Sequence, residues 1–239
     1  WGPVAASGPP PMPPQPAPAF DRAMADRYDE RNRGLAPISE ALHFLAGLAL
    51  ARAPETARVL SVGTGTGAEI LALARARPGW RFVGVDPSAE MLEVCAERPR
   101  AAGLEDRCTL VHGHVEDAPE GPFDVALAML VAHFVPQAER EGFYRAIHAR
   151  LVPGGRYLGA EICADLDAPE FPQLLADWEQ VQRLMGASPE SLAALPDLLR
   201  TKLAVLTPEA TVACLQAAGF ARPTPFFQAF MIRGFHADA

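Results

Sequence analysis

Cysteine is scarce in this chain of 239 residues, and its four cysteines, at positions 95, 108, 163 and 214, form no CxxC pair. Neither a zinc ribbon nor a dithiol redox motif is therefore expected, and we expect reduced thiols in a cytoplasmic protein. The sequence also lacks an apolar run of the roughly 18 residues that a membrane helix needs, and it shows no signal peptide. These absences predict a protein without membrane attachment.

Positive charge is in deficit, because 21 Lys and Arg residues face 29 Asp and Glu residues, which gives a formal net charge of −8. A long nucleic-acid interface needs a basic face, so nucleic-acid binding is disfavoured. With 49% hydrophobic residues, the chain can bury the core of one sizeable domain. Whether that domain forms a homodimer is left open.

The chain divides into a tail and one domain. Residues 1–19 contain eight prolines, which predicts a flexible or polyproline-like tail. Within the single domain expected over residues 20–239, residues 20–54 carry two helical patterns that are expected to cap a cleft. Residues 166–206 are predicted to form a helical lid, because their apolar side chains recur on one helical stripe.

The most informative stretch begins with a short apolar strand, Val59–Val62, followed by glycines at positions 63, 65 and 67 and a helical pattern over residues 68–77. A strand, a glycine turn and a helix together bring the backbone close to a nucleotide-like ligand, where a Cβ atom would obstruct it. On its own, this pattern also fits an ordinary turn between a strand and a helix.

A second strand, Arg81–Asp86, ends in a carboxylate roughly twenty residues after the glycine turn. That spacing lets the acid accept hydrogen bonds from ribose hydroxyls, so the two elements together predict an adenosine site. Further strand patterns at residues 108–112, 123–128 and 156–161 alternate with helices, and two short strands close the chain. The alternation predicts an α/β fold with a doubly wound, mostly parallel sheet.

The chain resembles the class I S-adenosylmethionine (SAM) dependent methyltransferases in the order and spacing of a series of motifs. These motifs are Val59–Gly67, Asp86, Gly113–Asp117, Phe123–Ala128 and Leu151–Gly155. The resemblance implies a seven-stranded Rossmann-like sheet whose last strand is antiparallel. It also implies SAM as the cofactor and S-adenosylhomocysteine as the product.

The resemblance and the cap helices together give an expected set of cofactor contacts. The set is Tyr28, Arg33, Gly63, Thr64, Gly65, Thr66, Asp86, Pro87, Met91, His114, Val115 and Met129. Asp86 would hold the ribose hydroxyls, and Met91 would cover the adenine. This chain departs from the family pattern at Ser61, where an acid is usual, and at His114, where Asp is common.

A narrower resemblance covers the part of the chain that follows Glu161, which is similar to bacterial carboxy-SAM synthase, an enzyme of tRNA wobble modification. Met129 stands where the synthase has Asn, and Arg200 is the nearest candidate for the arginine that binds its extra carboxylate. We therefore expect ordinary methyl transfer to an O, N or C nucleophile of a small molecule. The alternatives are synthase-like chemistry and a non-catalytic SAM-binding partner protein.

His133 is the predicted general base, because it follows the strand at residues 123–128 and imidazole titrates near neutral pH. A packing role for this histidine is the alternative. The predicted substrate contacts are Glu161, Phe171, Trp178, Met185 and Arg200. No metal site is expected, since His112 and His114 have no obvious third ligand.

Overall fold

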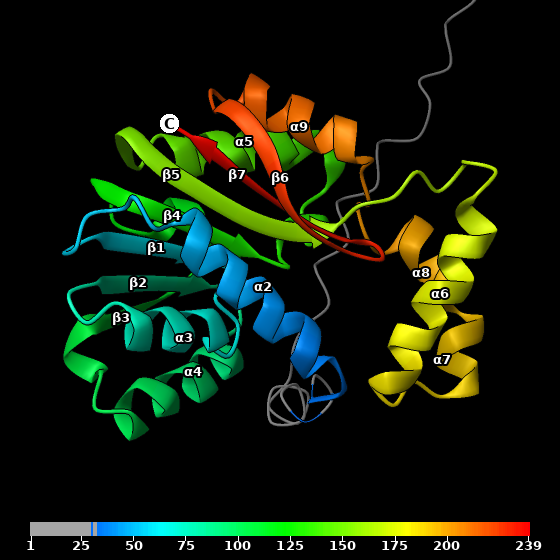
Figure 1. The fold of residues 1–239 in the computed structure, drawn as a ribbon, viewed down its shortest axis with the longest axis horizontal. Helices are drawn as coiled ribbons and strands as arrows, with labels where there is room; N and C mark the ends of the chain where they lie inside the picture. Colours follow the sequence, from blue (N-terminus) through cyan, green and yellow to red (C-terminus); the bar gives the residue numbers. More distant parts are fainter. Residues whose placement is uncertain (1–29, 31–32) are drawn as a thin grey trace, which may run out of the picture.

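The computed structural model describes Glu30 and residues 33–239, which are built around one seven-stranded sheet (Figure 1). The strands are β1 Arg58–Val62, β2 Arg81–Asp86, β3 Cys108–His112, β4 Phe123–Met129, β5 Leu151–Ile162, β6 Ala221–Ala229 and β7 Ile232–Asp238. Their order across the sheet is β3-β2-β1-β4-β5-β7-β6, and only β7 runs against its neighbours. The mostly parallel, doubly wound sheet of the sequence prediction is confirmed.

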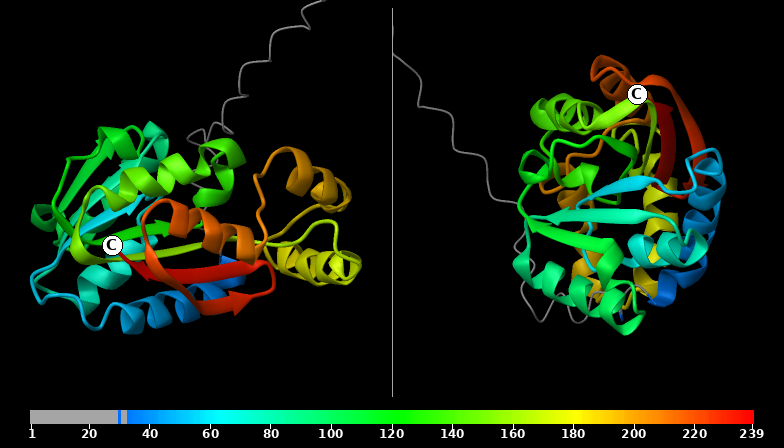
Figure 2. Two further views of the ribbon diagram at one scale, coloured as in Figure 1. Left: turned by 90° about the horizontal axis from the view of Figure 1, so that it is seen from above. Right: turned by 90° about the vertical axis from the view of Figure 1, so that its left-hand side faces the viewer.

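Helices cover both faces of this sheet, with α2 and α3 on one face and α5 and α9 on the other (Figures 1 and 2). The α-helices are α2 Ala36–Ala49, α3 Ala68–Ala76, α4 Ala89–Ala101, α5 Gln137–His148, α6 Phe171–Leu184, α7 Pro189–Ala193, α8 Leu195–Thr201 and α9 Pro208–Ala217. Short 3-10 helices are η1 Arg33–Leu35, η2 Glu105–Arg107, η3 Val115–Asp117 and η4 Ala132–Phe134.

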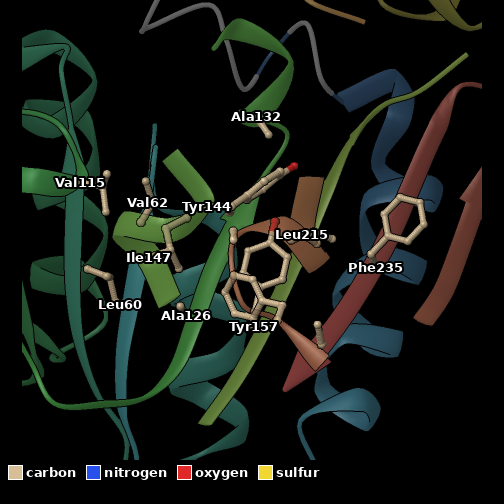
Figure 3. Close-up of a cluster of buried hydrophobic side chains, with 14 of the residues drawn as sticks. Leu60, Val62, Val115, Ala126, Ala132, Tyr144, Ile147, Tyr157, Leu215 and Phe235 are labelled. Atoms are coloured by element: carbon tan, nitrogen blue, oxygen red, sulfur yellow. The ribbon is translucent and has the colours of Figure 1, made fainter. Parts of the chain in front are cut away.

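The core is divided by the sheet because successive residues of a strand point to opposite faces. On β1, Leu60 and Val62 pack with α5 and α9 in the cluster that Figure 3 shows, whereas Val59 packs with α2 and α3. Each layer is therefore fixed by alternate side chains of the same strand. This arrangement holds the carboxyl ends of β1, β2 and β4 at one edge of the molecule.

Beyond that carboxyl edge, α6, α7 and α8 form a separate helical layer (Figures 1 and 2). Phe171, Trp178 and Val181 bury one face of α6 in a second apolar cluster, which also contains Leu35 of η1 and Ile232 of β7. The amphipathic stripe predicted for this segment is thus real. Its buried face packs against the end of the sheet and the first described residues of the chain.

Two elements differ from the sequence prediction. Strand β5 begins at Leu151 rather than Arg156, because Leu151 pairs with Phe123 ahead of an irregularity in the register. The helical segment predicted over residues 166–206 is divided into α6, α7 and α8, and Pro196 stands in the first turn of α8. Proline is tolerated in the first turn of a helix but disfavoured in its interior, which is consistent with a new helix that begins at Leu195. The predicted tail and most of the helix over residues 20–33 lie outside the described residues.

Candidate functional site

A cleft of about 1030 Å³ opens at the carboxyl edge of the sheet and is lined by α2, α3 and α4. It brings together most of the residues that the sequence predicted for a cofactor site. Those that line it are Arg33, Gly63, Thr64, Gly65, Thr66, Asp86, Pro87, Met91, His114 and Met129.

The glycine turn forms the floor of the cleft, and its glycines serve two purposes. Gly63, Gly65 and Gly67 have φ values of 64°, 52° and 75°, which side chains other than glycine rarely adopt. A Cβ atom on Gly63 would lie 2.2 Å from Cγ2 of Val131, whereas one on Gly65 would meet nothing within 4 Å. Gly63 is therefore required for packing, and the space above Gly65 is left open to a ligand.

Asp86 lies at the tip of β2 beside this turn and is 8% exposed. One carboxylate oxygen accepts a hydrogen bond from the Gly65 amide at 2.8 Å, and the other accepts one from the Ser88 amide at 2.9 Å. Burial raises the pKa of this carboxyl, and the two amide hydrogen bonds oppose that rise. Since each carboxylate oxygen offers two acceptor positions, Asp86 can still accept hydrogen bonds from a vicinal diol.

Glu69, in the first turn of α3, also lines the cleft, although it was not among the predicted cofactor contacts. Its Oε1 accepts hydrogen bonds from the hydroxyls of Ser61 at 2.8 Å and Thr64 at 3.3 Å. Burial raises the pKa of its carboxyl to about 7, and these hydroxyls partly counter the rise. The signal in the sequence was a serine at the usual acidic position, with a glutamate directly after the turn.

Helix α2 forms one wall of the cleft, and none of its residues was among the predicted contacts, which on the N-terminal side were Tyr28 and Arg33. Ile38, Ser39, Leu42 and His43 all line the cleft from this helix. Burial lowers the pKa of His43. Positions 38, 39, 42 and 43 share one face because residues three and four apart are neighbours on a helix, and this spacing was the available signal.

His133 does not stand at the mouth of the cleft. It is 4% exposed in η4 and is absent from the cleft lining, and its Nδ1 accepts a hydrogen bond from the Ile162 amide at 3.3 Å. Burial, together with the positive charge of Arg140, lowers the pKa of His133 to about 3. The imidazole is thus neutral near pH 7 and is occupied in packing, which was the alternative reading of this residue.

Glu161 is likewise absent from the cleft lining. It forms a buried ion pair with Arg140, and its other oxygen accepts a hydrogen bond from the Tyr144 hydroxyl at 2.5 Å. The Tyr157 ring packs edge-on against Tyr144. We refer to Arg140, Tyr144, Tyr157 and Glu161 as the Arg140 cluster. Because its carboxylate is already paired, Glu161 is not available as the predicted substrate contact.

The other predicted substrate contacts do not line the cleft themselves. Phe171 and Trp178 are buried, and Met185 packs against the same apolar cluster as Leu35 and Ile232, which do line the cleft. Arg200 donates to Asp167 at 2.8 Å and lies over the Phe171 ring, 5.5 Å from its centre. The expected direct contacts are therefore wrong for this conformation, because these side chains pack against one another.

Two predicted cofactor contacts remain. The Val115 side chain is 3% exposed and faces the core cluster rather than the cleft (Figure 3). Tyr28 lies outside the described residues. Among the residues that the structure does describe, no group of three or more His, Cys, Asp and Glu side chains could hold a metal ion.

The residues present fit an adenosine-type cofactor. Asp86 offers acceptors for a ribose diol, the open space at Gly65 admits a ligand next to the backbone, and Pro87 and Met91 offer apolar surface beside them. Apolar side chains then continue along the cleft toward Val131 and Phe134.

Comparison with known proteins shows the family to which the chain belongs. Residues 59–155 match the family model described as a methyltransferase domain. The chain is 30% identical to demethylmenaquinone methyltransferase of Thermus thermophilus, over 82% of this chain and 89% of the relative. It is 25% identical to carboxy-SAM synthase of Campylobacter jejuni, over 87% of this chain and 88% of that protein.

A solved O-methyltransferase family protein from Burkholderia thailandensis has the same fold, with a TM-score of 0.69 at 18% identity. The match covers 91% of this chain and 60% of that structure, so this chain spans about three fifths of the length of that relative. The chain belongs to the class I SAM-dependent methyltransferases, and SAM is its cofactor. Within the described residues, every helix is too short or too polar to cross a membrane.

Proposed function

We propose that this enzyme transfers the methyl group of SAM to a small, partly apolar acceptor and leaves S-adenosylhomocysteine. The observation that carries this proposal is the composition of the cleft. A polar floor at Gly65 and Asp86 continues into an apolar wall of Leu35, Ile38, Leu130, Val131, Phe134 and Ile232. Pockets for small molecules combine a few directed polar groups with apolar lining in this way.

The backbone after β4 supports this assignment. Leu130 has a φ of 57°, which is strained for a residue with a branched side chain, and its amide donates to the Ala160 carbonyl at 2.6 Å. Strain of this kind costs about 1 kcal/mol or more and is concentrated at functional sites. In this chain the strained residue, Leu130, and its neighbour Val131 both lie in the wall of the cleft.

SAM supplies an electrophilic methyl group on a sulfonium centre, so the protein has mainly to orient the reactants. In our proposal, Asp86 and the glycine turn hold the adenosine part, while the apolar wall orients the acceptor and excludes water. Orientation of this kind can provide several kcal/mol of the rate enhancement. No proton transfer is assigned to His133, because it is buried away from the cleft lining.

The proposal is tested by supplying methyl-labelled SAM with a panel of small apolar alcohols, phenols, amines and activated carbon acids. We expect label in at least one acceptor, and Ile38→Ala should raise the KM for that acceptor while the Kd for SAM stays unchanged. Phe44→Ala is the matched control, because Phe44 lies on the same helix but is 66% exposed and does not line the cleft. Tight SAM binding without transfer to any acceptor would favour a non-catalytic partner protein instead.

The second candidate is a carboxy-SAM synthase-like reaction, which rests on the similarity to the Campylobacter jejuni enzyme. The contacts of Arg200 with Asp167 and the Leu166 carbonyl weigh against it, because this arginine was the candidate for the extra carboxylate. Mass spectrometry of the ligand that copurifies with the protein separates the two. Carboxy-SAM would support the synthase, and SAM or S-adenosylhomocysteine would support methyl transfer.

The cellular location, the class of acceptor and the domain organisation of the enzyme are also proposals. We propose a cytoplasmic enzyme, because all four cysteines are free thiols, and a small molecule rather than nucleic acid as the acceptor, because the net charge is −8. We also propose residues 20–239 as a single domain. Within this domain, we propose that residues 166–206 form a lid over the cleft. Helix α6 of this segment packs against Leu35 and Ile232, which line the cleft.

A further inference from the structure

Glu69 is a buried carboxylate on the lining of the cleft with no cationic partner among the described residues. It is 9% exposed, and it accepts hydrogen bonds from the Ser61 and Thr64 hydroxyls and from its own backbone amide. Both hydroxyls bind Oε1, so Oε2 accepts no side-chain hydrogen bond within this part of the chain. A buried carboxylate that is held only by neutral donors is stabilised by a cation that binds beside it.

The charged and titratable groups around Glu69 come from several elements, and none is paired with it in the described residues. Asp86 faces it from β2 and Cys95 faces it from α4. His43 of α2 lines the same cleft, and burial lowers the pKa of its imidazole. Arg75 lines the cleft from the next turns of α3. The negative charge of Asp86 adds to the effect of burial on the Glu69 carboxyl.

We propose that the Glu69 carboxylate binds the α-ammonium group of the methionine part of SAM. This inference rests on the use of the cleft by SAM. SAM carries two cationic centres, and of these only the ammonium group has N–H donors for a carboxylate oxygen. Ser61 and Thr64 fix Oε1, which leaves Oε2 to the ligand, and the acid thus arrives from α3 rather than from the end of β1, where Ser61 stands.

A change in protonation follows from this contact. The pKa of the Glu69 carboxyl is about 7 in the free protein, because burial favours the neutral form. An ammonium group beside the carboxylate favours the charged form, so binding lowers that pKa and releases a proton near neutral pH. The affinity for SAM should therefore fall as the pH decreases below about 7, where the carboxyl must first lose its proton.

The test compares SAM, S-adenosylhomocysteine and methylthioadenosine as ligands of the wild type and of Glu69→Gln, by titration calorimetry in buffers of different ionisation enthalpy. Methylthioadenosine lacks the ammonium group and the rest of the amino acid. We expect Glu69→Gln to weaken SAM and S-adenosylhomocysteine by about tenfold, to leave methylthioadenosine unchanged and to abolish the proton release. Glu139→Gln is the matched control and should change none of the three affinities, since Glu139 also stands in the first turn of a helix, α5, but does not line the cleft.

Three results would overturn the inference. Equal weakening of all three ligands would show that Glu69 only supports the turn, and weakening of SAM alone would indicate the sulfonium as its partner. Unchanged binding of every ligand would remove Glu69 from recognition. If the wild type bound none of the three ligands, the use of SAM in this cleft would itself be wrong, which is a distinct outcome. Thermal unfolding of Glu69→Gln verifies that the variant is folded.

Discussion

Glu69 and Glu161 are both buried glutamates, with exposures of 9% and 3%, yet their surroundings differ. Glu161 is neutralised within the protein by Arg140 and receives a further hydrogen bond from Tyr144. Glu69 is held by two neutral hydroxyls and lies on the cleft lining. Removing one partner of a buried ion pair destabilises the fold, whereas a buried carboxylate without a counter-charge can pair with a cationic ligand. Variants of the Arg140 cluster and of the glycine turn should therefore change different properties.

Glu161→Gln should have the largest effect, which we expect on stability. It leaves the Arg140 guanidinium buried without its counter-charge, and breaking a buried pair in this way costs roughly 3–5 kcal/mol. Denaturation in urea measures the loss. The control is Glu141→Gln, because Glu141 pairs with Arg145 on the exposed side of α5, where such pairs contribute about 0.5 kcal/mol or less. A folded Glu161→Gln protein that has lost SAM affinity but no stability would contradict the comparison.

Asp86→Asn should give the next largest effect, on binding, together with a smaller loss of stability because the Gly65 or Ser88 amide loses its acceptor. The charged acceptor for the ribose hydroxyls is lost, which should cost on the order of 2 kcal/mol, or roughly a 30-fold rise in the Kd for SAM. Calorimetry measures it. Asp124→Asn is the control, because Asp124 also accepts a backbone hydrogen bond, from the Arg58 amide at 2.8 Å, but does not line the cleft. Equal affinities for the wild type and Asp86→Asn would exclude Asp86 from the site.

The glycine turn was predictable because its information is local. Gly63, Gly65 and Asp86 lie in two consecutive strand–turn units, and the spacing along the chain determines where they meet. Glu69 escaped the prediction although it is only two residues beyond the turn. Its role depends on the inward direction of the Ser61 side chain and on burial against α2, and periodicity alone does not define either of them.

The Arg140 cluster was not predictable from local patterns. Arg140 comes from α5, Glu161 from β5, and further acceptors are the carbonyls of Val135 and Ala204. These segments meet only when the sheet is assembled. His133 was placed wrongly for the same reason, because its backbone carbonyl accepts from the Ala204 amide and its ring faces β5. The side chain of His133, which follows β4, therefore points into the protein interior rather than toward the cleft.

His133 offers a pH-dependent test of this burial. Its pKa is about 3 in the folded protein against 6.5 as the ordinary value, so the unfolded state binds the proton first as the pH falls. Stability from this residue is therefore complete above about pH 6.5 and should be lower by about 1.4 kcal/mol at about pH 5.5. Urea denaturation of the wild type and of His133→Asn, whose amide oxygen can accept from Ile162, should show that extra slope only in the wild type. Identical slopes would mean that His133 is accessible and titrates normally.

Gly65→Ala should give the smallest effect. Together with Gly103→Ala, it distinguishes the cost of backbone strain from the effect of a side chain in the ligand site. Gly65 and Gly103 both have positive φ values, 52° and 67°, and a Cβ atom at either position meets nothing within 4 Å. Alanine should therefore cost about 1 kcal/mol of stability at both positions. Only Gly65 lines the cleft, so only Gly65→Ala should also weaken SAM, by about fivefold as its methyl group enters the space beside the turn. If Gly103→Ala weakened SAM equally, strain rather than position would explain the loss, and the open space at Gly65 would no longer identify the cofactor floor.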